Sequence, residues 1–382
     1  MKTIYRKIAC ITFMRIFYKI GYFIYYYNQE ECKKQVAKLI EKLFEFLKNN
    51  NSEENIENKD YFYDEFASKF LSILMYSTPN VVAFFGKEMF INYLQKPYFF
   101  RTTPSILRNF RYFISVLVDK YPGILIELFS NINSKFFDFL GSGRDKVKIL
   151  RRISFVIYSC EKDKFKNDFE KIREKAKFFL TSHKSNFKLE QEIFLMMRIL
   201  FLRFSHDGVM KMIKELWPII FTEIIQNLKN ENRNKELDLI IENFKFIELL
   251  SLANPEEFCL YQWIFLIDTF SMKDLDIKDQ KSLLSELLQK ENKIFKPVAL
   301  DFLDKNNLEI DNNIMEGKHK GKSTLIFRPE NATLEEMQKA LKNLFYSIGD
   351  MNNYKIELDL DQVEKFIEED FIDKDKENDE DN

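Results

Sequence analysis

The fold class follows from one segment, EIFLMMRILFLRFS, which spans residues 192–205. Its apolar side chains recur every three or four positions, at Ile193, Phe194, Met197, Leu200, Phe201 and Phe204. Residues 237–251 repeat the pattern, at Leu237, Ile240, Ile241, Phe244, Ile247 and Leu250. This period of 3.6 places the side chains on one face of an α-helix, whereas a half-buried strand alternates with a period of two. Both segments are therefore predicted to be amphipathic helices.

The composition extends this prediction to the whole chain. The 382 residues include 9 Gly and 8 Pro, less than half of the ~12% that these two residues average in proteins. Sheets with tight turns need Gly and Pro, so this composition disfavours a sandwich, barrel or propeller. We therefore predict an all-α fold: an elongated array of stacked antiparallel helix pairs, a HEAT- or armadillo-like α-solenoid.

Prolines and composition shifts indicate where helices begin and groups of helices end. Thr78-Pro79, Thr103-Pro104 and Asn254-Pro255 each place an N-cap residue before a first-turn proline, which favours a helix start. Gly141-Ser142-Gly143 is predicted to be an exposed break between two helical groups. The predicted regions are basic N-terminal helices and a polar loop (1–59), a first helical group (60–140), a second helical group (144–305), a polar loop with C-terminal helices (306–372) and a disordered acidic tail (373–382). Within the polar loop, residues 323–327 suit a short strand and residues 333–348 a helix.

The two ends of the chain carry opposite charge. Residues 1–50 contain ten basic and four acidic residues, and residues 350–382 contain fourteen acidic and four basic residues. Residues 8–27 are apolar but include Arg15 and Lys19 near their middle, which disfavours a membrane span. Their helical apolar spacing, at Phe13, Ile16, Phe17, Ile20, Phe23, Ile24 and Tyr27, fits two structures. One is a terminal helix packed on its neighbour, and the other is a cationic helix lying on a membrane surface.

No motif in the sequence supports an enzyme, so no catalytic, cofactor-binding or metal-binding residue is predicted. The four Cys form no C-x-x-C pair and the three His form no H-x-x-x-H pair. Residues 317–323 resemble a phosphate loop, but three residues rather than four separate the glycines. Ser205-His206-Asp207 lacks the geometry of a triad, and Ser205 and Asp207 are expected to cap a helix starting near Gly208. A net charge of −2 argues against nucleic-acid binding, and no small-molecule substrate is expected.

A basic cluster follows the Gly-Ser-Gly break, at Arg144, Lys146, Lys148, Arg151 and Arg152. It fits either an exposed helix face or a patch that binds anionic lipid or an acidic partner segment.

Several ordered landmarks resemble the C-terminal region of the Dopey family, over roughly residues 60–305. The most specific are residues 194–205, Leu216-Trp217-Pro218-Ile219-Ile220 and residues 222–226. Others, in the same order, are Tyr93-Leu94, Pro97, Phe99-Phe100, Phe113-Ile114, residues 150–155, Tyr158-Ser159, residues 246–250, residues 260–265 and Phe295-Lys296-Pro297. Family members are several times longer and carry an N-terminal domain that this chain lacks.

The resemblance implies a non-enzymatic scaffold or adaptor in vesicle-mediated protein transport between Golgi and endosomes. It implies a peripheral position on the cytosolic face of Golgi, trans-Golgi network and endosome membranes, as well as in the cytosol. The implied partners are a large Golgi protein related to Arf exchange factors, an aminophospholipid flippase and kinesin light chain. The alternative is a helical-repeat adaptor of another pathway, such as nuclear transport or phosphatase assembly.

Three aromatic residues carry much of this resemblance. Trp217 precedes Pro218, which disfavours helical geometry at the residue before it, so a break or kink is predicted at Leu216-Trp217, with Trp217 in the core. Tyr261 and Trp263 are two positions apart and cannot share a narrow helix face. The more exposed of these two is predicted to contribute to a partner surface.

Overall fold

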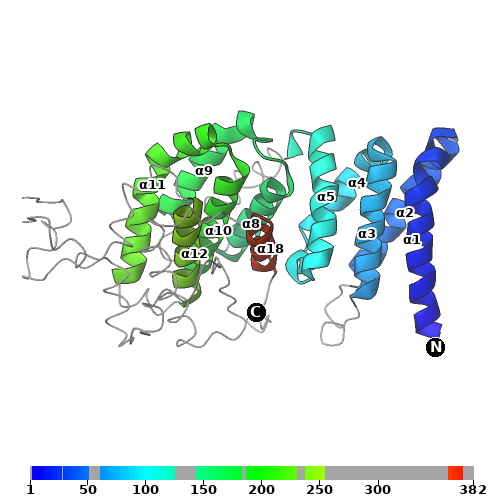
Figure 1. The fold of residues 1–382 in the computed structure, drawn as a ribbon, viewed down its shortest axis with the longest axis horizontal. Helices are drawn as coiled ribbons and strands as arrows, with labels where there is room; N and C mark the ends of the chain where they lie inside the picture. The colour runs from blue at the N-terminus through cyan, green and yellow to red at the C-terminus, as the bar shows by residue number, and fades with distance from the viewer. Residues whose placement is uncertain are drawn as a thin grey trace, which may run out of the picture. The chain divides into compact units, whose positions relative to one another are not determined.

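The computed structural model describes residues 2–27, 29–50, 61–124, 143–182, 186–229, 237–253 and 360–372. All regular structure in these ranges is helical, which confirms the predicted all-α class (Figure 1). The α-helices are α1 (Lys2–Tyr27), α2 (Gln29–Asn50), α3 (Phe62–Ser77), α4 (Pro79–Leu94), α5 (Pro104–Lys120), α8 (Gly143–Ser159), α9 (Phe169–Ser182), α10 (Phe187–Arg203), α11 (His206–Lys229), α12 (Leu237–Ala253) and α18 (Leu360–Asp370). Two 3₁₀ turns, η2 (Pro97–Phe100) and η3 (Lys166–Asp168), accompany them.

The chain forms two compact units. The first contains Met1–Asn167, Ile199–Ser205 and Ile367–Asn382, and the second contains Asp168–Arg198 and His206–Phe366. The predicted break lies partly outside the described residues, since the description resumes at Gly143. From there α8 packs against α5 within the first unit. The predicted strand at 323–327 and helix at 333–348 also lie outside the described residues.

The helices of the first unit stack in two layers. α1 packs on α3 and α3 on α5 in one layer, while α2 packs on α4 in the other (Figure 1). Each odd-numbered helix also contacts the even-numbered helix that follows it. This is the stacking of helix pairs that the sequence predicted, since each pair buries one face against the next.

Aromatic side chains fill the space between the two layers. Phe90 of α4 lies 5.1 Å from Phe113 and 5.7 Å from Phe110, both on α5, measured between ring centroids. Phe44 of α2 joins them, 6.1 Å from Phe113. Gly86 allows this close approach of α4 and α5, because a Cβ there would lie 3.3 Å from the Phe113 ring. Tilted and edge-on ring pairs at these separations add to the stabilisation from burial alone.

Two predicted helix starts are confirmed, but their caps differ from the expectation. α4 begins at Pro79 and α5 at Pro104, after Thr78 and Thr103, and neither threonine caps its helix through the side chain. The Thr78 hydroxyl instead donates to the Leu74 carbonyl, 3.0 Å away at the end of α3. This hydroxyl satisfies a carbonyl of the preceding helix rather than an amide of the following one.

Of the predicted break or kink at Leu216-Trp217, the second unit shows that the break was wrong. α11 runs without interruption from His206 to Lys229, with Pro218 inside it. Trp217 is 4% exposed and its ring lies 5.6 Å from that of Phe221. α11 packs on both α9 and α12, so buried contacts on both sides offset the hydrogen bond that proline removes. The predicted core position of Trp217 is confirmed.

An ion-paired cluster joins α10 to α12 in the second unit. Arg198 pairs with Glu242, and Lys245 donates to the same carboxylate over 2.8 Å. All three side chains are largely buried. The Glu242 carboxylate therefore gives each of the two cations an anionic partner away from water, which lowers the cost of burying them.

Candidate functional site

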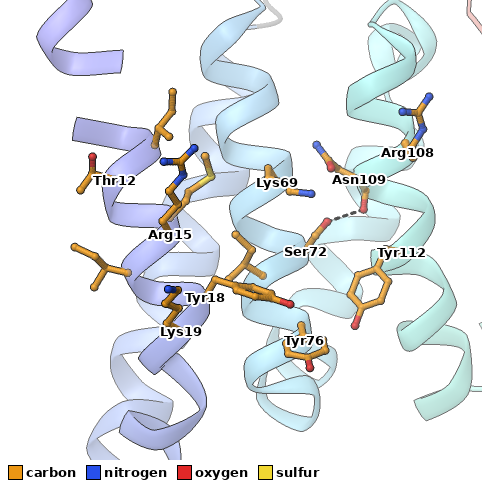
Figure 2. A pocket seen from close by; sticks show the side chains of 14 residues that line it. Thr12, Arg15, Tyr18, Lys19, Lys69, Ser72, Tyr76, Arg108, Asn109 and Tyr112 are labelled. Carbon is orange, nitrogen blue, oxygen red and sulfur yellow. Dashed lines mark hydrogen bonds between the residues drawn. The ribbon is translucent and has the colours of Figure 1, made fainter. Parts of the chain in front are cut away.

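A groove of about 940 Å³ crosses one face of the first unit, between α1, α3 and α5 (Figure 2). Its lining residues are Ile11, Thr12, Met14, Arg15, Ile16, Tyr18, Lys19, Lys69, Ser72, Ile73, Tyr76, Arg108, Asn109 and Tyr112. Buried residues of α3 and α5 form its floor, and exposed residues of α1 and α5 form its walls. A volume of this size suits a small-molecule or headgroup-sized ligand.

The floor of the groove is held rigid by hydrogen bonds between α3 and α5. Ser72 Oγ donates to the Asn109 carbonyl over 2.7 Å, and Asn109 Nδ2 donates to Ser68 Oγ over 3.0 Å (Figure 2). All three residues are buried. Because these buried polar groups bond one another, they fix the spacing of α3 and α5 before any ligand arrives.

The charged side chains that line the groove are all cationic. Arg15 and Lys19 extend from α1, Lys69 from α3 and Arg108 from α5 (Figure 2). The fourteen lining residues include no carboxylate. Like charges that converge on one concave surface raise the local concentration of anions.

Three tyrosines from three helices border one part of the groove. The Tyr18 and Tyr76 rings stack with centroids 5.7 Å apart. Partial burial, together with the nearby Tyr76 and Tyr18 hydroxyls, raises the pKa of Tyr112. The Tyr112 phenol therefore remains a neutral hydrogen-bond donor at neutral pH, beside the four cations.

A segment from the far end of the chain is anchored next to the groove. Glu368, in the last turn of α18, accepts hydrogen bonds from Arg108 Nε and Nη2 over 3.1 and 2.8 Å and from Arg111 Nη1 over 2.6 Å. Its side chain is 3% exposed. Phe371 lies 5.0 Å from Phe155 of α8, ring to ring. The sequence predicted C-terminal helices and acidic charge in this region but not the pairing, because no local pattern reports a contact between residues 260 positions apart.

The basic cluster predicted after the break lies on α8 and is partly engaged within the first unit. Arg152 Nη2 donates to the Gln95 carbonyl over 2.6 Å, at the C-terminal end of α4. Arg151 lies 5.8 Å from the centre of the Phe100 ring. The Arg152 contact satisfies a carbonyl at the C-terminal end of α4, where a cation is favourable, and the Arg151 contact is a cation–π interaction. Lys146 and Lys148 are half-buried, and the Arg144 side chain lies outside the described residues.

The Ser205-His206-Asp207 run lies at the start of α11, two residues earlier than predicted. The Ser205 amide donates to Asp163 Oδ1 over 2.7 Å, and this hydrogen bond lowers the pKa of Asp163. Asp163 has a left-handed backbone, with a φ of 62°. The Ser205 amide therefore links the junction of α10 and α11 to the turn that follows α8.

The described part of the chain holds a protected thiol at Cys160 and no metal-binding cluster. Cys160 is buried, which raises the pKa of its thiol to about 12. Among the described residues, no group of three His, Cys, Asp or Glu side chains is placed to hold a metal ion. Tyr261 and Trp263 lie outside the described residues, so their partner surface stays a prediction.

Comparison with known families identifies the chain. Residues 124–354, well over half of the chain, match the family described as DOP1 C-terminal. The chain belongs to the DOP1 C-terminal family. This confirms the resemblance to the Dopey C-terminal region. The match begins later and ends later than the predicted range of 60–305, so the groove residues lie before the part of the chain that matches DOP1.

Two further comparisons gave no match. No curated protein matches this DOP1 C-terminal chain. No solved structure is similar to it either. Among the described helices, none combines the length and the hydropathy needed to cross a bilayer.

Proposed function

We propose that the protein is a non-enzymatic scaffold or adaptor in vesicle-mediated protein transport between the Golgi and endosomes. The observation that carries the proposal is the DOP1 C-terminal match over residues 124–354. Stacked helices support a scaffold function, because each added pair extends a continuous surface for protein contacts.

The proposed location is the cytosolic face of Golgi, trans-Golgi network and endosome membranes, with peripheral rather than integral attachment. The proposed partners are a large Golgi protein related to Arf exchange factors, an aminophospholipid flippase and kinesin light chain. Resemblance to the Dopey family supports both the location and the partners.

A tagged full-length chain tests this function in two measurements. Fluorescence should coincide with Golgi and endosome markers, and alkaline carbonate should release the protein from membranes. Affinity capture should recover the Golgi partner and the flippase. Of the single variants Tyr261→Ala and Trp263→Ala, the one at the more exposed position should reduce that recovery. Accumulation in the nucleus, or capture of phosphatase subunits instead, would favour an adaptor of another pathway.

A further inference from the structure

The solvent face of α1 differs from an ordinary helix surface. In its 26 residues α1 contains no Asp or Glu and five basic residues. Its exposed apolar and aromatic side chains include Tyr5 at 65%, Ile8 at 54%, Ile16 at 51%, Phe23 at 61% and Tyr26 at 62%. Single exposed apolar residues are normal, but a contiguous set of them indicates an interaction surface.

The regularly spaced apolar residues between Phe13 and Tyr27 do not all lie on the same side of α1. Phe13 and Phe17 lie 5.4 and 5.2 Å from Phe70 of α3, ring to ring. Ile16 and Phe23 are turned about 100° away from Phe17 on the helix and stay exposed. Packing on α3 therefore uses only part of the apolar surface of α1, and Ile8 and Ile16 remain more than half exposed.

The exposed face and the groove are continuous. Arg15, Ile16 and Lys19 are exposed on α1 and also line the groove. Lys69 lines the same groove from α3 (Figure 2). None of the three cations has an ion-pair partner among the described residues, unlike Arg108, which Glu368 holds. The surface thus combines side chains that leave water readily with cations available for an anionic group.

A membrane surface with anionic lipid fits both parts of this surface. Aromatic and aliphatic side chains enter the boundary between headgroups and acyl chains, while Arg and Lys remain at the phosphate level. An acidic protein segment in the groove would neutralise Arg15, Lys19 and Lys69. It would leave Tyr5, Ile8, Phe23 and Tyr26 exposed to water.

We propose that α1 and the adjoining groove form the membrane-docking surface of the first unit. In this arrangement α1, which is about 39 Å long, lies in the plane of the membrane. Ile8, Ile16 and the exposed aromatic residues insert, and Arg15, Lys19 and Lys69 bind lipid phosphate. This surface gives the peripheral attachment proposed above a location, and to that extent it rests on the proposed function.

Vesicle flotation with the full-length chain tests the proposal. The probe is phosphatidylcholine vesicles with about 30 mol% phosphatidylserine, since anionic lipid adds ~1 kcal/mol per nearby basic residue. Arg15→Gln with Lys19→Gln should weaken binding about 30-fold, the equivalent of two such contacts. Ile8→Ser with Ile16→Ser removes apolar insertion and leaves mainly the electrostatic attraction to anionic lipid. Binding of this variant should therefore disappear at about 0.5 M salt, where screening is strong.

A matched control separates this surface from general charge. Lys38 and Lys42 are exposed on α2, in the other layer of the same unit. Lys38→Gln with Lys42→Gln makes the same charge change and should alter binding less than about threefold. Circular dichroism of each variant should match the wild type, because all substituted side chains are exposed.

Three results would overturn the proposal. The first is a wild-type chain that fails to float with phosphatidylserine vesicles. The second is equal loss of binding in the α1 and α2 variants. The third is binding of a poly-glutamate peptide in the absence of vesicle binding, which would assign the groove to an acidic protein segment. None of these results bears on Golgi location or partner capture, so the proposed function would stand or fall separately.

Discussion

Replacing Trp217 with alanine should destabilise the second unit by about 3–5 kcal/mol, the usual cost of removing a buried aromatic side chain. Trp217 is 4% exposed and contacts Phe221 edge-on. A buried aromatic side chain removes ~150–250 Å² from water, which at ~25 cal/mol per Å² gives about 4–6 kcal/mol as an upper bound. Partial collapse of the cavity lowers this value.

Differential scanning calorimetry measures the effect. At roughly 2–4 °C per kcal/mol, the transition of the second unit should fall by about 6–20 °C. Phe178→Ala is the matched control, because Phe178 lies in the same unit on α9 and is 44% exposed. It should cost no more than about 1 kcal/mol. A Trp217→Ala protein that unfolds at the wild-type temperature but no longer captures its partners would make Trp217 a contact residue and refute its core assignment.

Three further perturbations test the first unit. Glu368→Gln should lower the free energy of unfolding in urea by about 2–3 kcal/mol, since it removes the carboxylate that pairs with the largely buried Arg111. The value is discounted because the other partner, Arg108, is 58% exposed. An equal loss from Asp361→Asn, at an exposed position of α18, would contradict this. Cys160 should resist iodoacetamide at pH 8 in peptide mapping by mass spectrometry, because its thiol stays protonated below a pKa of about 12; rapid labelling in the native protein would show that it is accessible. Asn109→Ala should cost about 1–2 kcal/mol, because Ser68 loses a hydrogen bond inside the α3–α5 interface; unchanged stability would mean that the floor of the groove is not held by this bond.

Local sequence patterns predicted local structure well. The stripes at 193–204 and 237–250 are helices, and Pro79 and Pro104 begin helices where expected. Period and cap chemistry depend on residues within one turn, so they can be read directly from the chain.

Predictions failed where distant contacts decide the outcome. Pro218 disfavours a helix locally, but burial of its neighbours against α9 and α12 keeps α11 continuous. The groove needs Arg15, Lys69 and Arg108 from three helices, and no sequence spacing reports that they meet. The apolar spacing on α1 predicted the helix correctly but not which of its faces remains exposed. That face depends on how much of the α1 surface packs against α3.

The anchoring of Glu368 and Phe371 has a consequence for synthesis of the protein. Phe100, Phe155 and Tyr158 leave the ribosome more than 200 residues before Phe371, the side chain that packs on all three. At about 5–20 residues per second, this aromatic surface waits roughly 10–40 s for its cover. During that interval the nascent chain displays a hydrophobic strip of the kind that chaperones bind. A chain that stops before residue 368 would keep the strip exposed and leave Arg108 and Arg111 without the carboxylate that neutralises them.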